Sequence, residues 1–170
     1  MNAESLFLLI GGNQGDRKAT LGQATDLIQQ RIGSVVGSSA VYQTAPWGDF
    51  AGDEKPQDFL NQALEVRTSL SPYECLAQAL AIEKELGRVR EGSTPKLYYS
   101  RPIDIDMILY GSLVIRSPKL ILPHPRMHLR RFVLVPLCEI AGERIHPVFN
   151  KTILQLLSEC PDTSFCSVCC

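Results

Sequence analysis

The run from Ile103 to Tyr110 constrains the fold more than any other segment, and it reads IDIDMILY. Side chains on a β-strand alternate between its two faces. A strand here sends its odd-numbered apolar residues, Ile103, Ile105, Met107 and Leu109, into a core. Asp104 and Asp106 then project together from the opposite face, roughly 6.6 Å apart along the strand. The chain must therefore contain a sheet with a buried face and a place on the other face for two carboxylates.

Helical and extended patterns surround this strand in a definite order. We expect a strand over 5–10, a helix from Asp16 through Ile32, strands over 35–44 and 59–68, a capped helix over 72–87, and the strand 103–110. Strand, helix, strand, strand, helix, strand is the split βαβ pattern of ferredoxin-like sheets. The pattern therefore predicts an α+β fold with a ferredoxin-like antiparallel sheet flanked by helices. A C-terminal extension should add short helices near 128–140 and 152–160.

Length, charge and hydropathy limit the classes of protein. The chain has 170 residues, of which 45% are hydrophobic, and a net charge of −1. That length suits one domain, which we expect over residues 1–160. There is no basic excess to hold nucleic acid and no apolar stretch of the ~20 residues that cross a bilayer. We expect a cytoplasmic monomer whose partners are small molecules.

Four of the six cysteines lie within the last eleven positions, as Cys160, Cys166, Cys169 and Cys170. This crowding is not the spacing of a secreted disulfide framework, and no neighbouring histidine or second cysteine pair completes a four-ligand metal site. We therefore expect residues 161–170 to be a frayed, cysteine-rich tail that can be removed without loss of activity.

The two aspartates of the strand need compensation by positive charge. Two carboxylates on one face repel each other, and aspartate is a poor strand former. Arg101 lies just upstream, and Mg²⁺ commonly binds one or two carboxylates together with substrate phosphates. The alternative is a solvated strand face, which the apolar neighbours of the two acids make the weaker interpretation.

Glu83 is a second acid in an unusual place. It lies on the inward face of the helix 72–87, three to seven residues from apolar positions of that face. A buried acid needs a partner, and the last turn of a helix disfavours negative charge. A salt bridge to Arg88 or Arg90 and a role in ligand binding explain Glu83 equally well. The apolar positions are Leu76, Ala79, Leu80 and Leu86.

Basic residues surround these acids in the sequence: Arg88, Arg90, Arg101, Lys119, Arg126, Arg130 and Arg131. Arginine forks bind phosphate oxygens in pairs, so acids for Mg²⁺ beside several arginines favour a polyphosphate site. For Arg126 and Arg131 taken singly, an ordinary charged surface is the better interpretation. The segment 11–15, GGNQG, fits neither common phosphate-binding loop, so a nucleotide such as ATP, if it is the ligand, is held in another way.

Six segments together resemble the 6-hydroxymethyl-7,8-dihydropterin pyrophosphokinase family over most of residues 6–147. They are FLLIGGN, YQTAPWG, FLNQA, IEKELGRVR, RPIDIDMILYG and LPHPRMHLRRFVLVPL. The resemblance implies a ferredoxin-like sheet flanked by helices. It also implies transfer of the diphosphate of ATP to the hydroxymethyl group of the pterin, with release of AMP, in folate biosynthesis.

The resemblance also assigns roles to individual residues. It implies that Asp104 and Asp106 bind two Mg²⁺ ions and that Arg88, Arg90, Arg101, Asp104 and Asp106 are catalytic. The positions that match the ATP site are Glu83, Arg88, Arg90, Arg101, Met107, Lys119, His124 and Arg130. Those that match the pterin site are Gly11, Thr44, Ala45, Trp47, Phe59, Asn61, Asp104 and Phe132, with Phe59 and Phe132 on the two faces of the ring.

Three positions depart from the family pattern: Phe59 stands where tyrosine is frequent, Gly12 where serine is frequent, and Pro125 where an aromatic residue can contact the nucleotide. The connections 45–58 and 91–100 are expected to act as lids that exclude water, with Tyr98 or Tyr99 over the nucleotide. A binding module without catalysis, such as a pterin or nucleotide sensor, remains the alternative, and turnover separates the two.

Overall fold

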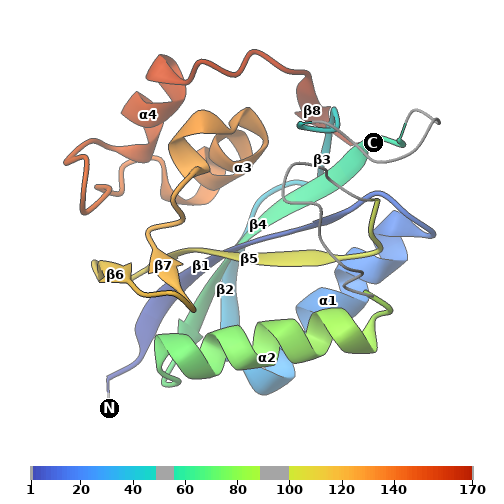
Figure 1. The fold of residues 1–170 in the computed structure, drawn as a ribbon, viewed down its shortest axis with the longest axis horizontal. Helices are drawn as coiled ribbons and strands as arrows, with labels where there is room; N and C mark the ends of the chain where they lie inside the picture. The colour runs from blue at the N-terminus through green and yellow to red at the C-terminus, as the bar shows by residue number, and fades with distance from the viewer. Residues whose placement is uncertain (1, 49–55, 89–99, 170) are drawn as a thin grey trace.

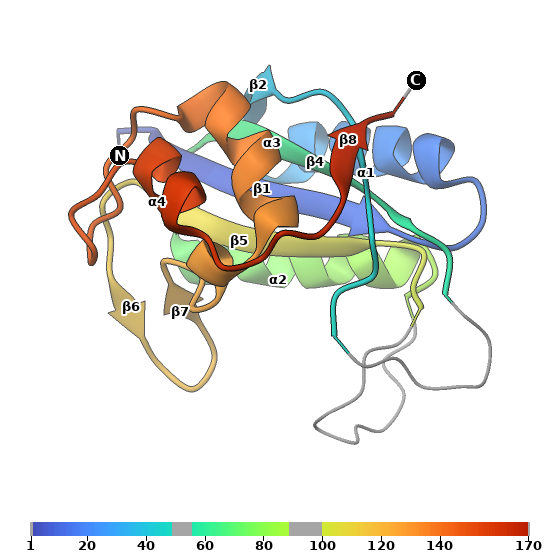
Figure 2. The same cartoon turned by 90° about the horizontal axis from the view of Figure 1, so that it is seen from above.

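The protein is an antiparallel sheet between two pairs of helices (Figures 1 and 2). This computed structural model describes residues 2–48, 56–88 and 100–169. Arg90, Tyr98, Tyr99 and nearly all of the expected lid 91–100 lie outside the described residues, as does half of the connection 45–58. Among the described helices, none is both long and apolar enough to cross a bilayer.

The elements follow the predicted order. They are β1 Glu4–Gly12, α1 Arg17–Arg31, β2 Ser34–Ser38, β3 Tyr42–Thr44, β4 Phe59–Thr68, α2 Pro72–Glu85, β5 Asp104–Tyr110, β6 Ile115–Arg116, β7 Ile121–Leu122, a 3₁₀ turn Met127–Leu129, α3 Arg131–Ala141, α4 Ile153–Glu159 and β8 Cys166–Val168. The sheet order is β5-β1-β4-β3-β8, and β2 also pairs with β4. The α+β, ferredoxin-like fold is thus confirmed.

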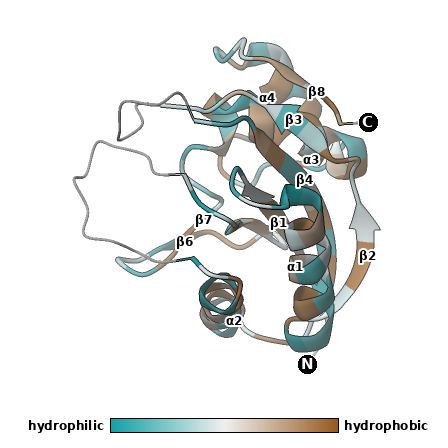
Figure 3. Ribbon diagram, turned by 90° about the vertical axis from the view of Figure 1, so that its right-hand side faces the viewer, coloured by the Kyte–Doolittle hydropathy of each residue, from teal (hydrophilic) through white to brown (hydrophobic). Residues whose placement is uncertain are grey.

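Each face of the sheet has its own core. One core joins the sheet to α1 and α2, and the other joins it to α3 and α4. Figure 3 shows hydrophobic and hydrophilic residues alternating along α1 and α2. This pattern is expected of helices that pack one face on a sheet and expose the other. Local signals also set the helix ends: Asp16 caps α1, Ser71 and Glu74 form a capping box on α2, and Gly87 ends that helix at a φ of 95°.

The strand β5 departs from simple alternation at one residue. Leu8 of β1 faces Met107, but the preceding Phe7 faces Leu109, so Ile108 is an extra residue in β5. Such a bulge shifts later side chains to the other face. The predicted inward face is therefore correct as far as Met107 and wrong for Leu109, which packs with Ile108 in the core beneath α3 and α4.

The strand expected over 35–44 is divided into β2 and β3. Between them, the Ser39 hydroxyl accepts the Ala63 N–H of β4, and the Glu139 carboxylate of α3 accepts the Ala40 N–H and the Tyr42 hydroxyl. They stand beside a backbone bond from the Ser39 N–H to the Ala63 carbonyl at 2.9 Å, and they interrupt the regular ladder between the two strands. Both pieces still pair with β4, as predicted for the two strands.

The C-terminal segment is not frayed. Residues 166–168 form β8, which pairs antiparallel with β3 at the edge of the sheet. The expectation of a frayed tail was wrong because strand pairing depends on a distant partner, which composition does not reveal. The two short helices are confirmed as α3 and α4, although α3 begins at Arg131 because a 3₁₀ turn precedes it.

Candidate active site

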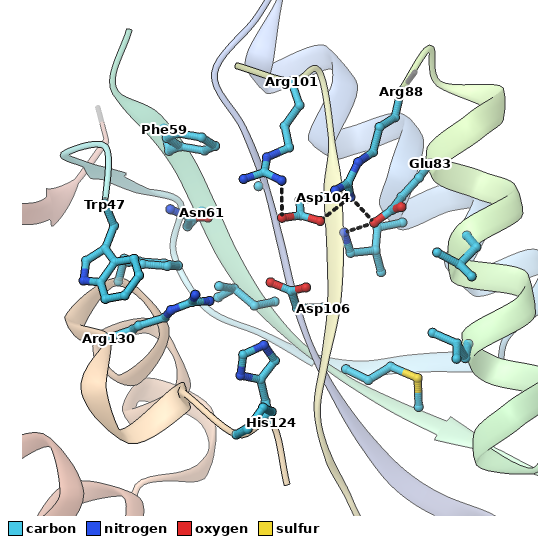
Figure 4. Close-up of a pocket in the computed structure, with 18 of the residues that line it drawn as sticks. Trp47, Phe59, Asn61, Glu83, Arg88, Arg101, Asp104, Asp106, His124 and Arg130 are labelled. Atoms are coloured by element: carbon cyan, nitrogen blue, oxygen red, sulfur yellow. Dashed lines mark hydrogen bonds and ion pairs between the residues drawn. The ribbon is translucent and has the colours of Figure 1, made fainter. Parts of the chain in front are cut away.

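A cavity of about 480 Å³ lies at one end of the sheet, between β5, α2, the β6–β7 hairpin and the start of α3 (Figure 4). It brings together every described residue that the family resemblance assigned to a site. These are Gly11, Thr44, Ala45, Trp47, Phe59, Asn61, Glu83, Arg88, Arg101, Asp104, Asp106, Met107, Lys119, His124, Arg130 and Phe132. Arg126 and Arg131 are not among its lining residues, which agrees with their interpretation as ordinary surface charges.

Both members of the acid pair line this cavity, and they come from one face of β5, as the strand pattern predicted. Asp104 accepts a hydrogen bond from the Arg88 guanidinium, and Arg101 Nη1 lies 3.6 Å from the other Asp104 oxygen. Burial acts to raise the pKa of Asp104, but the charges of Arg101 and Arg88 outweigh it and lower the pKa. Asp104 is therefore an ionised carboxylate held by two guanidinium groups.

Asp106 is electrostatically different from its neighbour. Burial, followed by repulsion from the Asp104 charge, raises the pKa of Asp106 to about 7. Additional positive charge is needed to keep both carboxylates ionised, and two carboxylate groups are suitable ligands for Mg²⁺ when phosphates complete its coordination. Among the described residues, no cluster of three or more His, Cys, Asp or Glu side chains could hold a metal by itself. The two carboxylates alone give Mg²⁺ few ligands, so they fit an ion whose other ligands are phosphate oxygens and water.

Glu83 connects α2 to the acid pair. Its side chain is buried, and its Oε1 accepts the Ile105 N–H of β5 at 2.8 Å and a hydrogen bond from Arg88 Nη1 at 2.7 Å. Arg88 thus lies between Glu83 and Asp104, so the predicted salt bridge is confirmed with Arg88 as the partner. The sequence placed Leu80 in the buried stripe of α2, but Leu80 is 39% exposed and instead lines the cavity.

The opposite end of the cavity combines an amide with aromatic rings. Asn61 Nδ2 donates to Thr44 Oγ1 at 2.8 Å, and both side chains are buried. Gly11 lies opposite Asn61 in the neighbouring strand, and a Cβ there would be 2.0 Å from Asn61 Oδ1. Any other residue at position 11 would displace the Asn61 side chain, so this position requires glycine. The rings of Phe59 and Phe132 line this end as well.

Arg130 lies between two of the aromatic residues. Its guanidinium carbon is 4.6 Å from the centre of the Trp47 ring and 5.7 Å from that of Phe132. Arginine stacks well on aromatic faces, so this contact holds a positive charge at the junction of the two cavity ends.

His124 lies near Asp106 in Figure 4. Burial and then the Arg130 charge lower the pKa of His124 to about 4, which makes it a neutral donor or acceptor near pH 7.

Asn13 is an important residue whose role sequence reasoning missed. It is buried, and its Oδ1 accepts the Arg101 N–H at 2.9 Å. Its Nδ2 donates to the Gln57 carbonyl at 3.2 Å and to Ser100 Oγ at 3.1 Å. Asn13 therefore fixes the backbone that carries Arg101. The only signal was the GGN segment, which was compared with phosphate loops and not with a structural asparagine.

Gly12 also has a physical reason to differ from the serine that is frequent in the family. A Cβ at this position would lie 2.1 Å from the Pro102 carbonyl oxygen, so the chain beside Arg101 packs directly on the glycine.

Sequence reasoning also missed the apolar part of the cavity wall. It comes from α2 and from the hairpin of β6 and β7, through Leu76, Leu80, Pro118, Leu120 and Ile121.

Paired carboxylates among arginines, next to an aromatic pocket that bears an amide, are typical of enzymes that transfer phosphoryl groups. A model of the 7,8-dihydro-6-hydroxymethylpterin-pyrophosphokinase (HPPK) family matches residues 7–142, and the chain belongs to this family. The resemblance read from the sequence motifs is thereby confirmed, and the chain is an ATP-dependent pyrophosphokinase of folate biosynthesis.

Relatives in other organisms support the family assignment. Two proteins named 2-amino-4-hydroxy-6-hydroxymethyldihydropteridine pyrophosphokinase are similar to this chain. The one from Porphyromonas gingivalis is 41% identical over 143 residues, which cover 84% of this chain and 93% of the relative. The one from Bacillus subtilis is 42% identical over 138 residues, which cover 81% and 78%.

The fold is also similar to that of solved structures. The wild-type HPPK-DHPS of Plasmodium falciparum with pteroate superposes with a TM-score of 0.74 at 16% identity, over 94% of this chain. This chain spans only 45% of that protein. The likeness supports the fold alone.

Proposed function

We propose that this cavity transfers the diphosphate of ATP to the hydroxymethyl group of 6-hydroxymethyl-7,8-dihydropterin and releases AMP. The observation that carries the proposal is the division of one cavity into two ends. Carboxylates and guanidinium groups form one end, and an amide with aromatic rings forms the other. A triphosphate at the first end and a pterin at the second would meet near Asp106, where the two ends join in Figure 4.

At the phosphate end, we assign Arg88 and Arg101 to the phosphate oxygens, together with Arg90, which lies outside the described residues. Lys119, His124 and Arg130 also line the cavity and are assigned to the nucleotide, and Glu83 and Met107 complete its site. Asp104 and Asp106 would hold two Mg²⁺ ions. Mg²⁺ bound there would neutralise the phosphates and orient the attacking hydroxyl for in-line transfer.

The protein contributes mainly charge and position to the reaction. Attack on the β-phosphorus expels AMP, and negative charge accumulates on the oxygens around the transferred group. Arg88 is fixed by Glu83 and Asp104 before substrate arrives, so little reorganisation is needed to stabilise this charge. The apolar hairpin around Leu120 helps to exclude water, which would otherwise compete with the alcohol. We assign no general base.

At the ring end, we assign the pterin to the space between Phe59 and Phe132. Aromatic rings above and below a flat ligand provide stacking, and the Asn61 amide with nearby backbone groups at 44 and 45 can read the donor and acceptor edge of the ring. The Gly11 backbone borders this edge without a side chain. Thr44 keeps the Asn61 amide oriented.

The extent of the working unit is also part of the proposal. We propose that residues 1–160 contain all the catalytic groups, that the chain acts as a monomer and that it works in the cytoplasm. The described cavity residues all come from this one stretch, between Leu9 and Phe132.

The products of the reaction test the proposed function directly. Incubation of the protein with ATP, Mg²⁺ and the hydroxymethyl dihydropterin should give AMP in equal amount to the pterin diphosphate. AMP should not form when the pterin alcohol is omitted. ADP as the main product would indicate an ordinary kinase, and the absence of any nucleotide product would favour a sensor.

Trp47 should report pterin binding. It is the only tryptophan of the sequence, and its ring lies against Arg130 in the cavity. A pterin placed beside these residues changes the surroundings of the indole, so the protein fluorescence should change saturably as pterin is added. Free N-acetyltryptophanamide controls for light absorbed by the pterin. Equal loss of signal from the protein and from this control would argue against the ring site.

A further inference from the structure

Residues 162–169, which we call the C-terminal strap, contact two cavity elements that are far apart in the sequence. In Figures 1 and 2, the chain that leaves α4 passes the start of α3 and ends in β8 beside β3. The strap has an acidic residue at one end, Asp162, and the strand β8 at the other. Both ends contact parts of the protein that shape the ring end of the cavity.

Asp162 supplies the cap that α3 lacks locally. The N-cap position of α3 is Arg130, whose side chain makes no capping hydrogen bond. The Arg131 N–H instead donates to Asp162 Oδ2 at 2.9 Å. A carboxylate at a helix N-terminus satisfies a free N–H and interacts favourably with the helix dipole. Ser164 holds the other oxygen of Asp162 through its N–H at 2.9 Å and through its hydroxyl.

Asp162 caps α3 at Arg131, whose two neighbours in the sequence have side chains that line the cavity. Arg130 and Phe132 flank Arg131, and both line the cavity. Their backbone therefore depends on where the first turn of α3 is held. Arg130 also carries the contact with Trp47. A displaced first turn would move one face of the proposed pterin site together with the stacked guanidinium.

The other end of the strap supports the opposite side of the ring site. Thr44 of β3 faces Cys166, the Ala45 N–H donates to the Phe165 carbonyl at 3.3 Å, and the Cys169 N–H donates to the Val41 carbonyl at 2.7 Å. β3 has only three residues and pairs with β4 on its inner side. The strap gives this short strand a second hydrogen-bonded neighbour, next to the residue that orients Asn61.

We propose that the C-terminal strap is a positioning element for the pterin substrate, with Asp162 as its main positioning residue. The inference depends on the proposed function, because it assigns the strap to the pterin end of that same site. It also reverses the expectation that the tail can be removed without effect, because the strap contacts the first turn of α3 and the strand β3. The phosphate end draws mainly on α2, β5 and residues 119–124 and shares only Arg130 with the first turn of α3, so the strap should affect the pterin more than ATP.

The test compares Asp162→Ala with Glu159→Ala in the full-length protein. Glu159 is an exposed acid of α4 that pairs with Lys151 at 2.6 Å, so its removal is a matched control for loss of a C-terminal carboxylate. In Asp162→Ala, the KM for the pterin should rise about tenfold, which corresponds to ~1.4 kcal/mol. The KM for ATP should change by less than about twofold, and Glu159→Ala should leave both unchanged.

Asp162→Asn separates position from general stability. It keeps the shape of the side chain and one acceptor oxygen, so its pterin KM should fall between those of the unaltered protein and Asp162→Ala. Circular dichroism shows which variants are folded. If Asp162→Ala does not fold, the pterin KM of Asp162→Asn tests the proposal instead. Equal increases in both KM values, or no increase in a folded variant, would overturn the proposal.

Failure of the proposed function would look different. If the unaltered protein formed no AMP, the pyrophosphokinase proposal would be contradicted, and the strap would still be decided by pterin titration of Trp47 fluorescence. A pterin affinity in folded Asp162→Ala equal to that of the unaltered protein would contradict the strap alone.

Discussion

Asp104→Asn and Asp106→Asn are each expected to lower kcat by about 10³-fold or more, because each removes a carboxylate assigned to the phosphate-bound Mg²⁺. The rate of AMP formation at saturating ATP, Mg²⁺ and pterin measures the effect. Asp26→Asn on the exposed side of α1 is the matched control and should stay within about twofold of the unaltered rate. A near-native rate in either site variant would contradict the metal assignment.

The same variants should fold, and Asp106→Asn should stabilise the protein in the absence of metal. The folded pKa of Asp106 is raised to about 7, above its value in the unfolded chain, because of burial and the Asp104 charge. The folded state therefore retains a proton that the unfolded state has lost, and stability falls as the pH rises from about 4 to about 7.

Asparagine at position 106 has no such titration. The melting temperature of Asp106→Asn in EDTA should exceed that of the unaltered protein, by a margin that widens between about pH 4.5 and pH 8. A constant margin over this range would show that Asp106 is not the group that titrates.

Local sequence signals predicted those parts of the fold that local contacts determine. Two helices were predicted from the caps at Asp16 and Ser71 and from Gly87, which has the positive φ of a helix end. The alternation of side chains along the strand predicted that Asp104 and Asp106 share one face. The bulge at Ile108 was not predictable, because a shifted register between two strands leaves no mark on either one.

The errors have a common physical origin in distant partners. The strand 35–44 is interrupted where Glu139 of α3 takes over its hydrogen bonds, and β8 exists because β3 is there to pair with it. Neither effect is visible in the composition of the segment itself. The burial of Asn13 is similar, since its partners are Gln57, Ser100 and Arg101.

The acidic part of the cavity was predictable from the residues themselves, because charged side chains in a buried setting are informative, whereas the aromatic and amide part came only from the family resemblance. Glu83 on an inward helix face and two aspartates in an apolar strand each required a partner, and Arg88 pairs with both Glu83 and Asp104, while Arg101 lies beside Asp104. The apolar wall around Leu80 and Leu120 was missed because an apolar residue on an element surface is ordinary by itself. Only the cavity shows that these side chains face a ligand.

Glu83→Ala is expected to lower the free energy of unfolding by about 3 kcal/mol, because it leaves the Ile105 N–H and part of the Arg88 charge without their buried partner. Glu85→Ala is the matched control, since it also removes a glutamate of α2 that pairs with an arginine, here Arg31 at the surface. That exposed pair should contribute no more than ~0.5 kcal/mol. Urea unfolding of both variants measures the difference.

Glu83→Gln then decides between the two roles that the sequence left open. The glutamine oxygen can still accept the Ile105 N–H, so most of the stability should remain, but the charge that holds Arg88 is lost. Because Arg88 also contacts Asp104, its loss of position should lower kcat by about tenfold or more even in a well-folded protein. If Glu83→Gln were as active as the unaltered protein, Glu83 would be a structural acid that joins α2 to β5. A lowered kcat with preserved stability would make the same carboxylate a positioning residue of the phosphate site.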